Sequence, residues 1–569
     1  MKASDYIVEY LIGKGITDVF GYPGGMVTHL MDSFSKYQGQ IAAHVTYHEQ
    51  GAAFAACGYA QTSGKVGVAY ATSGPGATNL ITGICNAFFD SIPTLFITGQ
   101  VNTFEAKNEM PVRQRGFQET DIVSMVKGVT KYAAKVDNAD GLKWQLDFAF
   151  AQAQSGRKGP VLLDIPMDIL HAEIDADQVS VYEASEIHES TLDESRIAQI
   201  REALKQAKRP VILLGNGIKM ANAVADARKV IAKLGIPTVS TMISMDIVNE
   251  SALNYGFIGA YGDRAANFIV AKSDLLLSLG ARLDVRQVGA KRENFAPNAT
   301  LIRVEVDEGE LAYRVHDNEV AICADVSAVL RVLNDIWDNI LLDYSEWLEI
   351  CSTIRFMLAG MDKRLPNEIV EQISEHIPSN AVITADVGQN QIWVAQSLRV
   401  KERQKVVFSG GHGAMGYSLP AAIGCYYASH GPVVSFNGDG GIQMNIQELQ
   451  TIARERLPIK IVLMNNSALG MIRHFQEMYF GENYVQTVAT GGYTVPDFGA
   501  IAKAYGIEYY KIESADDVRA SLFEGVAPCL IEVSIKENTY VFPKLEFGKP
   551  NQDQEPLMDR ALFNYLSSL

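Results

Sequence analysis

The chain has 569 residues, of which 47% are hydrophobic and 20% charged, a composition typical of a globular protein. At about 100–200 residues per domain, this length predicts three or more domains. The formal net charge of −17 argues against a nucleic-acid partner, because such proteins concentrate Lys and Arg.

The sequence also gives expectations about compartment. The N-terminus lacks the apolar core of a signal peptide, and the chain has no apolar span long enough for a membrane helix. The six cysteines form no CxxC pair, which predicts neither a zinc site nor a disulfide framework. We therefore expect a cytoplasmic protein without a membrane partner.

Short apolar segments rich in Val, Ile and Leu recur along the chain and do not alternate with polar residues. Such segments, separated by helix-length stretches, predict the strands of parallel sheets that helices cover on both faces. In chain order the predicted strands lie within residues 66–74, 95–100, 161–166, 211–215, 274–280, 301–307, 381–388, 433–439, 459–467 and 529–535. The expected fold is α/β, with doubly wound parallel sheets.

Two interruptions divide this pattern. Residues 172–195 are acidic and polar without a helical stripe, which is typical of a linker between domains. A second break lies near residues 340–365. The predicted units are three domains and a C-terminal tail, at residues 1–175, 190–340, 365–540 and 541–569.

One carboxylate stands out in the first domain. Residues 47–60 read YHEQGAAFAACGYA, so Glu49 begins a helix of otherwise small and mostly apolar residues. We expect such a helix to be buried, and burying a charge costs free energy unless a partner needs it. Taken alone, Glu49 is most simply a carboxylate favoured by the helix dipole.

The most specific pattern lies in the last domain. Asp439 follows one predicted strand and Asn466 follows the next, so both fall at the same edge of a parallel sheet. Their oxygens, with the backbone carbonyl of Ala468, suit a Mg²⁺ ion that takes its other ligands from a diphosphate. The glycines that would let phosphates approach the backbone are Gly438, Gly440 and Gly441. A generic glycine-rich turn is the alternative, and the NN pair at this spacing argues against it.

GDG followed by NN resembles the thiamin diphosphate binding motif, and the whole chain resembles the catalytic subunits of the acetohydroxyacid synthase family. The other segments that carry the resemblance, in the family's order, are GYPGG at 21–25, HEQGAAFAACGYA at 48–60, TSGPGATN at 72–79, FQETDIV at 117–123, GPVLLDIP at 159–166, DVGQNQIW at 386–393 and GGHGAMGYSLPAAIG at 410–424. The resemblance implies a pyrimidine-binding first domain, a central domain that often holds FAD, a diphosphate-binding last domain, and active sites between subunits.

The resemblance also implies roles for single residues. Those at the reacting centre are Glu49, as the activating carboxylate, with Gly25, Phe117 and Gln118. Those at thiamin diphosphate, besides the three glycines above, are Tyr22, Pro75, Asn79, Gln389, Asn390, Gly413, Met471 and Met415, the last as a wedge that bends the cofactor. Those at FAD are Gly215, Gly217, Arg264, Gly280, Arg282, Asp284, Arg286, Glu305, Asp307 and Asp325.

This resemblance gives the charge of Glu49 a purpose. Thiamin diphosphate loses a ring proton to its own aminopyrimidine, and a carboxylate against the pyrimidine nitrogen stabilises the tautomer that accepts the proton. In an apolar pocket such a hydrogen bond is stronger than in water. The activated cofactor decarboxylates a 2-oxo acid and retains a two-carbon nucleophile.

The fate of the two-carbon unit separates the relatives. Enzymes that resemble pyruvate decarboxylase protonate it with a His-His pair, and this chain has no HH dipeptide. Glyoxylate carboligase has an apolar residue in place of Glu49. We expect a transferase that joins the two-carbon unit of pyruvate to a carbonyl acceptor, most simply a second 2-oxo acid, giving 2-acetolactate. The alternatives are an FAD-dependent pyruvate oxidase and a non-catalytic cofactor-binding partner, and the latter is disfavoured by the joint presence of Glu49, Asp439 and Asn466.

The central domain resembles the flavin-contacting part of the family at four segments. These are LLGNGI at 213–218, YGDRAAN at 261–267, GARLDVRQVG at 280–289 and VEVDEGEL at 304–311. Val285 departs from the family pattern, which has a second Asp after Asp284. FAD is expected, with a structural role in a synthase. The alternative is a nucleotide-binding-like domain that has lost its ligand.

Three further departures lie on the acceptor side. Met167 stands where the family has Lys, and Phe475 stands where it has a Trp associated with preference for 2-oxobutyrate. The segment before FQE, NTFEAKNEMPVRQRG at residues 102–116, is longer than in the family and basic, and we call it the basic loop. A smaller ring could reverse that preference, because one methylene in a pocket is worth about 1–3 kcal/mol. Arg113 and Arg115 could meet phosphate oxygens, or could belong to a solvated loop.

Loops of this kind resemble synthase-like proteins of surface-polysaccharide pathways, including the yersiniose-forming two-carbon transferase. A nucleotide-linked keto-sugar is therefore the alternative acceptor, giving a branched-chain sugar. The expected assembly is a homodimer or homotetramer with Mg²⁺, thiamin diphosphate and FAD.

Overall fold

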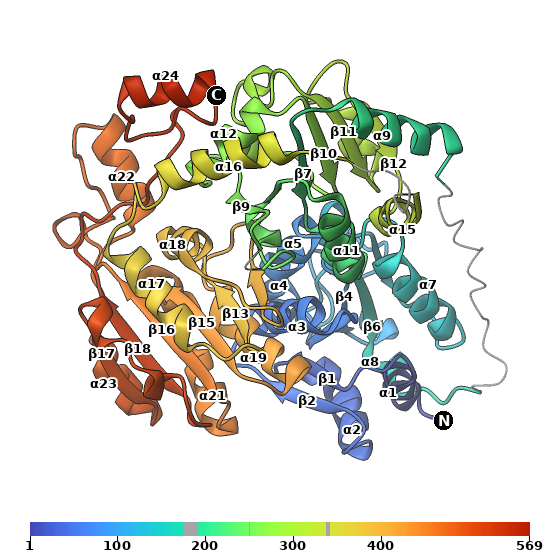
Figure 1. Cartoon of the computed structure of the whole chain (residues 1–569). Coiled ribbons are helices and arrows are strands. Elements are labelled where there is room, and N and C mark those ends of the chain that lie inside the picture. Colours follow the sequence, from blue (N-terminus) through green and yellow to red (C-terminus); the bar gives the residue numbers. More distant parts are fainter. Residues whose placement is uncertain (176–191, 250, 337–341) are drawn as a thin grey trace.

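The computed structural model describes residues 1–175, 192–249, 251–336 and 342–569. They form three six-stranded sheets in which every strand pairing is parallel (Figure 1), and this confirms the predicted α/β class. Within these ranges, no helix is both long and apolar enough to cross a membrane. Most of the predicted first linker, residues 176–191, lies outside the described residues.

The first sheet has the strand order β2-β1-β3-β4-β6-β5. Its strands are β1 (Asp18–Gly21), β2 (Ala42–Val45), β3 (Gly67–Ala71), β4 (Thr94–Gln100), β5 (Tyr132–Lys135) and β6 (Pro160–Pro166). Its helices are α1 (Ala3–Gly13), α2 (Thr28–Lys36), α3 (Glu49–Ser63), α4 (Pro75–Asn79), α5 (Ile81–Phe89), α6 (Ile122–Val126), α7 (Leu142–Gln154) and α8 (Met167–His171). The inner strands β3, β4 and β6 are buried along their whole length, since helices cover both faces.

The middle sheet, counted from β9, has the order β9-β8-β7-β10-β11-β12. Its strands are β7 (Pro210–Leu214), β8 (Thr238–Ser240), β9 (Asn254–Phe257), β10 (Leu275–Leu279), β11 (Thr300–Glu305) and β12 (Val320–Cys323). The helices of this part are α9 (Glu194–Gln206), α10 (Gly217–Met220), α11 (Val224–Leu234), α12 (Arg264–Lys272), α13 (Val285–Val288), α14 (Glu308–Ala312), α15 (Val326–Ile336) and α16 (Ser345–Leu358). In order along the chain this is a 3-2-1-4-5-6 sheet, the arrangement of dinucleotide-binding folds.

The last sheet, β14-β13-β15-β16-β18-β17, repeats the order of the first. Its strands are β13 (Val382–Ala385), β14 (Lys405–Phe408), β15 (Val433–Gly438), β16 (Ile459–Asn465), β17 (Glu508–Ile512) and β18 (Cys529–Ser534). Its helices are α17 (Leu365–His376), α18 (Gln389–Ser397), α19 (Ser418–Ser429), α20 (Asp439–Met444), α21 (Leu449–Glu455), α22 (Gly470–Tyr479) and α23 (Phe498–Tyr505), and α24 (Arg560–Ser568) ends the chain.

In each sheet the strand order reverses direction beside the first strand of that sheet. This reversal lies between β1 and β3 in the first sheet, between β7 and β10 in the middle sheet, and between β13 and β15 in the last. Ligands of open parallel sheets bind outside the carboxyl ends of the strands at such switch points. The fold therefore offers three candidate crevices before any side chain is considered.

Two segments outside the predicted middle domain pack on its core. Helix α16 lies within the stretch where the second break was predicted, and its Trp347 joins the same hydrophobic cluster as Val211 of β7. The C-terminal helix α24 covers this domain as well (Figure 1), and its Phe563 ring meets Phe268 of α12 at 5.5 Å between centroids. The chain thus returns to the middle domain after completing the last sheet.

The first and last domains are joined by helices α3 and α19, which touch backbone to backbone. A Cβ on Gly424 of α19 would lie 1.8 Å from the carbonyl oxygen of Ala55, and one on Gly58 of α3 would lie 2.2 Å from that of Ala421. Almost all of α3 is buried in this contact. The small residues that the sequence places in α3 are therefore needed for the approach of the two helices, and this contact sets the position of Glu49.

Replacing Gly424 by Ala should destabilise the protein by about 1–3 kcal/mol, because the new methyl group forces the two helices apart. Thermal and urea unfolding followed by circular dichroism would measure this. The control is Gly13→Ala at the end of α1, where a Cβ meets nothing within 4 Å, so it should not destabilise. Equal stability of both variants would contradict the packing described here.

Candidate active site

The switch point of the first sheet is built from two glycine-containing turns. Tyr22 and Gly25 follow β1, and Pro75 begins α4 after β3. Gly24 has no room for a side chain, because a Cβ there would lie 2.3 Å from the Cβ of Thr72 in the facing turn. The turns can therefore approach each other closely at the strand ends.

Glu49 lies beside this crevice as the first residue of α3, with only 7% of its surface exposed. Its Oε2 accepts a hydrogen bond from Asn79 Nδ2 at 3.0 Å. No described residue donates to the other oxygen, Oε1, which would lie 3.2 Å from a Cβ on Gly76. The helix N-terminus favours the negative charge. The predicted Glu49 and Asn79 are thus brought together, with one carboxylate oxygen left for a ligand.

Two of the three residues predicted beside Glu49, Gln118 and Phe117, differ in position. Gln118 packs on the turn before Pro75, where a Cβ on Gly74 would lie 2.9 Å from the Cβ of Gln118. Gln118 itself has a φ of 63°, which is uncommon for a residue other than glycine. Phe117 is 78% exposed. Within one chain, therefore, Gln118 borders the crevice and Phe117 points to solvent.

The switch point of the last sheet is organised by Asp386, a residue that the sequence analysis did not single out. It is fully buried, and its two oxygens accept from the backbone amides of Gly416 and Tyr417, each at 3.0 Å. These bonds fix the turn that carries Met415. Burial raises the pKa of Asp386 to about 6. On the opposite side, a Cβ on Gly441 would lie 1.8 Å from Asp386 Oδ2, so that turn requires glycine.

Three oxygens converge at the ends of β15 and β16. The side-chain oxygen of Asn466 lies 3.1 Å from Asp439 Oδ2 and 2.9 Å from the carbonyl oxygen of Ala468. Oxygens at these distances repel one another unless a cation lies between them or the amide turns over to donate. The present orientation lets Asn466 Nδ2 donate to Gln389 Oε1 at 3.0 Å. With the amide in this orientation the set is all oxygen and includes a carboxylate, which fits Mg²⁺, whereas the reversed amide would donate to Asp439 Oδ2 and to the Ala468 carbonyl oxygen.

Asp439 is 2% exposed, and burial raises its pKa to about 6. A bound cation would favour the charged carboxylate and offset this effect. Its second oxygen, Oδ1, accepts from the hydroxyl of Tyr493 at 2.8 Å. Tyr493 was not predicted from the sequence, because it lies 54 positions further along the chain in a segment without a recognised motif.

The other residues predicted to contact the diphosphate surround the same turn. A Cβ on Gly470 would lie 1.9 Å from Gln389 Oε1, and one on Gly438 would lie 3.1 Å from Asn390 Oδ1. The methyl carbon of Met415 would lie 3.2 Å from a Cβ on Gly440. Gly413, in the turn before Met415, has a φ of +68°, and Met471 follows Gly470 in α22. The structure gathers these residues around one glycine-lined turn.

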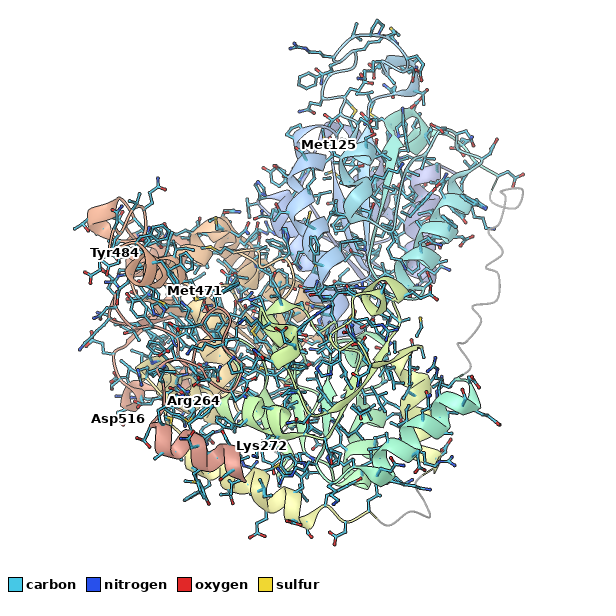
Figure 2. All side chains as sticks on the ribbon, turned by 90° about the horizontal axis from the view of Figure 1, so that it is seen from above. Met125, Arg264, Lys272, Met471, Tyr484 and Asp516 are labelled. Atoms are coloured by element: carbon cyan, nitrogen blue, oxygen red, sulfur yellow. The ribbon has the colours of Figure 1, made fainter. Side chains whose placement is uncertain are left out.

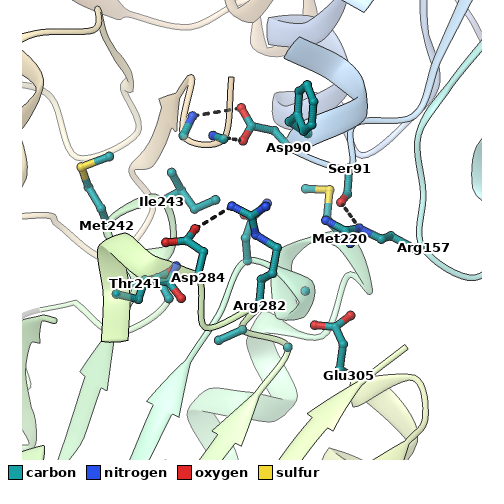
Figure 3. A pocket seen from close by; sticks show the side chains of 18 of the residues that line it. Asp90, Ser91, Arg157, Met220, Thr241, Met242, Ile243, Arg282, Asp284 and Glu305 are labelled. Carbon is teal, nitrogen blue, oxygen red and sulfur yellow. Dashed lines mark hydrogen bonds and ion pairs between the residues drawn. The ribbon is translucent and has the colours of Figure 1, made fainter. Parts of the chain in front are cut away.

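A third site lies at the switch point of the middle sheet, where a cavity extends between all three domains (Figure 3). Gly280 lines the cavity and packs on Gly215, where a Cβ would lie 2.1 Å from the Gly280 carbonyl oxygen. Arg282 Nη2 donates to Asp284 Oδ2 at 2.6 Å within the cavity wall. The predicted FAD residues that line the cavity are Gly217, Gly280, Arg282, Asp284, Arg286, Glu305 and Asp325.

The first domain contributes to the same cavity. Asp90 accepts from the amides of Gly410 and Gly411 of the last domain at 3.0 and 2.6 Å, and its burial raises its pKa to about 6. Arg157 Nε donates to Ser91 Oγ at 2.9 Å (Figure 3). The charged groups of the wall fit a ligand with both anionic and hydrogen-bonding parts, as a dinucleotide has.

Three predicted flavin residues, Gly215, Arg264 and Asp307, lie outside the cavity wall. The Arg264 guanidinium is buried and paired with Asp362 at 2.6 Å, and it also donates to the carbonyl oxygen of Gln554 at 3.0 Å. The structure thus gives Arg264 a role in holding the C-terminal segment. Asp307 acts indirectly, since it pairs with Arg157 of the wall at 3.0 Å.

The residues predicted on the acceptor side fall into two groups. Met167 lies at the start of α8, and its neighbour Asp168 anchors the basic loop by accepting from the Thr103 amide at 3.0 Å. Within that loop Arg115 donates to the carbonyl oxygens of Phe104 and Ala106, so its guanidinium supports the loop itself, whereas Arg113 is exposed.

Phe475 lies elsewhere, on α22 of the last domain, and is 48% exposed. Met125, just after the basic loop, and Met471, one turn before Phe475, lie on separate parts of the molecule (Figure 2). The two acceptor groups therefore belong to different domains of the chain.

Comparison with known proteins agrees with this geometry. Models of thiamine pyrophosphate enzymes match the chain in three parts: the N-terminal TPP binding domain at residues 1–125, the central domain at 197–333 and the C-terminal TPP binding domain at 386–533. The chain is 37% identical to the acetolactate synthase isozyme 2 large subunit of Escherichia coli over 97% of this chain and 99% of that protein. It is 34% identical to the acetolactate synthase large subunit of Lactococcus lactis, over 96% and 95%, and 34% identical to acetolactate synthase 1, chloroplastic, of Nicotiana tabacum, over 97% and 84%.

Replacing Asp439 by Asn should abolish retention of Mg²⁺ and thiamin diphosphate, because it removes the only charged oxygen of the converging set. Dialysis followed by metal and thiamin analysis would measure this. Asp284→Asn, which alters a carboxylate of the middle cavity instead, is the control and should keep both. Unchanged retention in the Asp439 variant would show that the metal site is wrongly placed.

Proposed function

Because the chain belongs to the acetolactate synthase large-subunit family of thiamine pyrophosphate enzymes, we propose that it condenses two molecules of pyruvate to 2-acetolactate and CO₂. It is a C–C bond-forming transferase that depends on thiamin diphosphate. Two observations together carry the proposal. Glu49 is buried and accepts a hydrogen bond from Asn79 at the switch point of the first sheet. At the switch point of the last sheet, Asp439 lies beside Asn466 and Ala468.

Each group of residues has a defined task in this reaction. Thiamin diphosphate, when bound, supplies the carbon nucleophile that attacks the 2-oxo acid. Asp439, Asn466 and Ala468 would hold Mg²⁺ and through it the diphosphate. The free oxygen of Glu49 would share a proton with the pyrimidine ring nitrogen and so stabilise the tautomer in which that nitrogen is protonated. The low polarity around α3 strengthens that hydrogen bond.

We further propose that each site is shared by two chains of a homodimer or homotetramer. No hydrogen bond or ion pair among the described residues joins Glu49 and Asn79 directly to Asp439 and Asn466. Phe117 of the first domain and Phe475 of the last domain expose apolar side chains. A partner chain that brings its last domain against the first domain of this one would cover such surfaces and complete the site.

FAD is proposed for the cavity of the middle sheet. Its support is the 3-2-1-4-5-6 strand order together with the charged wall at the β7–β10 switch point. The role proposed for FAD is structural, since the cavity lies where all three domains meet and a bound dinucleotide would hold them together.

A keto-sugar linked to a nucleotide remains the second candidate for the acceptor. Met167 beside the anchored loop, the exposed Arg113 and the half-exposed Phe475 favour it. Arg115 supports it less than the sequence suggested, because its guanidinium is used within the loop. The 2-oxo acid is therefore the first choice.

With pyruvate alone, the protein should form CO₂ and 2-acetolactate in equal amounts, measured by coupled release and by mass spectrometry.

Glu49→Gln should lower the rate by about 10²–10⁴ while cofactor binding persists, because a positioned acid or base contributes that much. Glu346→Gln is the matched control, since Glu346 also lies in the first turn of a helix but is exposed. A fully active Glu49 variant would refute the proposed mechanism, and product only with keto-sugars would favour the second acceptor.

Purified protein should be yellow and should release FAD when denatured. Turnover should consume no oxygen, because a structural flavin passes no electrons to it. Arg282→Ala should lose flavin on dialysis, whereas Arg196→Ala, on the exposed face of α9, should retain it. A colourless protein whose activity does not respond to added FAD would remove flavin from the proposal, and stoichiometric peroxide would favour an oxidase.

A further inference from the structure

The segment of residues 484–495, which we call the Tyr493 loop, is bonded at two points to the residues that form or flank the proposed metal site. At one end, the Leu469 amide, next to Ala468, donates to the carbonyl oxygen of Thr487 at 3.0 Å. At the other, the Tyr493 hydroxyl donates to Asp439 Oδ1 at 2.8 Å. The loop therefore bonds to Asp439 itself and to the residue that follows Ala468.

The loop is buried at its first point of contact, whereas residues 489, 490 and 492 are exposed. Thr487 and Val488 are 2% and 3% exposed, and the Tyr493 amide donates to the Val488 carbonyl oxygen at 3.0 Å. Thr487 Oγ1 also donates to Gln476 Oε1 of α22 at 2.6 Å. The Tyr493 side chain is thus presented by a folded turn that is itself attached to the last domain.

The direction of the Tyr493 bond decides what it does. A phenol is protonated at neutral pH, so its hydroxyl donates and Asp439 Oδ1 accepts. This leaves Oδ2 as the oxygen beside the Asn466 side chain, where it also accepts from the Asn466 backbone amide at 3.0 Å. Partners of this kind, behind a metal ligand, fix its orientation and are worth about 10–100-fold in metal affinity.

Tyr493 also borders the turn where the diphosphate is proposed. A Cβ on Gly440 would lie 3.3 Å from the Tyr493 hydroxyl and 3.2 Å from the Met415 methyl carbon. The hydroxyl therefore contacts the edge of the glycine turn on the side of Asp439.

We propose that Tyr493 is a positioning residue for the metal site, and that docking of the Tyr493 loop and binding of Mg²⁺ with thiamin diphosphate strengthen each other. The inference rests on the proposed function, which supplies the metal. Since coupling between two events is reciprocal, the factor by which the Tyr493 bond tightens metal binding is also the factor by which the metal stabilises the docked loop.

Tyr493→Phe removes only the hydroxyl and should weaken Mg²⁺ binding by about 10–100-fold at fixed thiamin diphosphate. Metal-free protein with a fixed concentration of thiamin diphosphate is titrated with Mg²⁺. Tryptophan fluorescence and calorimetry measure the binding. The matched control is Tyr484→Phe, in the same loop, whose hydroxyl donates to Glu477 at 2.9 Å and touches no metal ligand. It should bind Mg²⁺ as the unaltered protein does.

A second measurement uses the unaltered protein and does not depend on how the variant folds. Hydrogen exchange of the amides of residues 488–493 should slow when Mg²⁺ and thiamin diphosphate are added. Unchanged or tighter Mg²⁺ binding in the Tyr493 variant, or unchanged exchange in the unaltered protein, would overturn the inference. If the unaltered protein binds neither Mg²⁺ nor thiamin diphosphate, the proposed function itself fails, so the two failures are distinguishable.

Discussion

The contact between helices α3 and α19 is the constraint on which the rest of the site depends. Their glycines allow a separation that no Cβ would permit, and this locks the first domain onto the last. The last domain also holds the start of α3 directly, because Glu448 accepts from the Tyr47 amide at 2.8 Å and Asn445 donates to Gln50 at 3.0 Å. Glu49 is therefore positioned by contacts from both domains.

Most inner strands were predictable from the sequence, whereas the edge strands and the inner strands β1 and β8 were not. Strands such as β10 and β16 are covered on both faces and must be apolar throughout, which gives a continuous signal. Edge strands such as β5 and β17 are half-buried or exposed along most of their length, so their residues are mixed and carry no clear period. The strand order, and hence the switch points, depends on contacts distant in sequence, which no local pattern contains.

The candidate site was predictable where chemistry and spacing coincide, as in Asp439 and Asn466. It was not predictable where a side chain acts through tertiary contacts. Asp386 supports the Met415 turn and Tyr493 supports Asp439, yet neither carries a distinctive neighbourhood in the sequence. Arg264 lies in a segment that resembles the family's flavin-contacting part, which led to its prediction at FAD. In the structure its guanidinium bonds to Asp362 and to the carbonyl oxygen of Gln554 in the C-terminal segment.

The central claim is that catalysis needs Glu49 of one chain and the Asp439 oxygens of another. Subunit complementation tests it most directly: chains with Glu49→Gln and chains with Asp439→Asn, each inactive alone, are unfolded together, refolded and assayed with pyruvate. Random pairing makes half of the dimers mixed, each with one intact site, so about a quarter of full activity should return. No recovery, although mixed dimers form, would contradict the account.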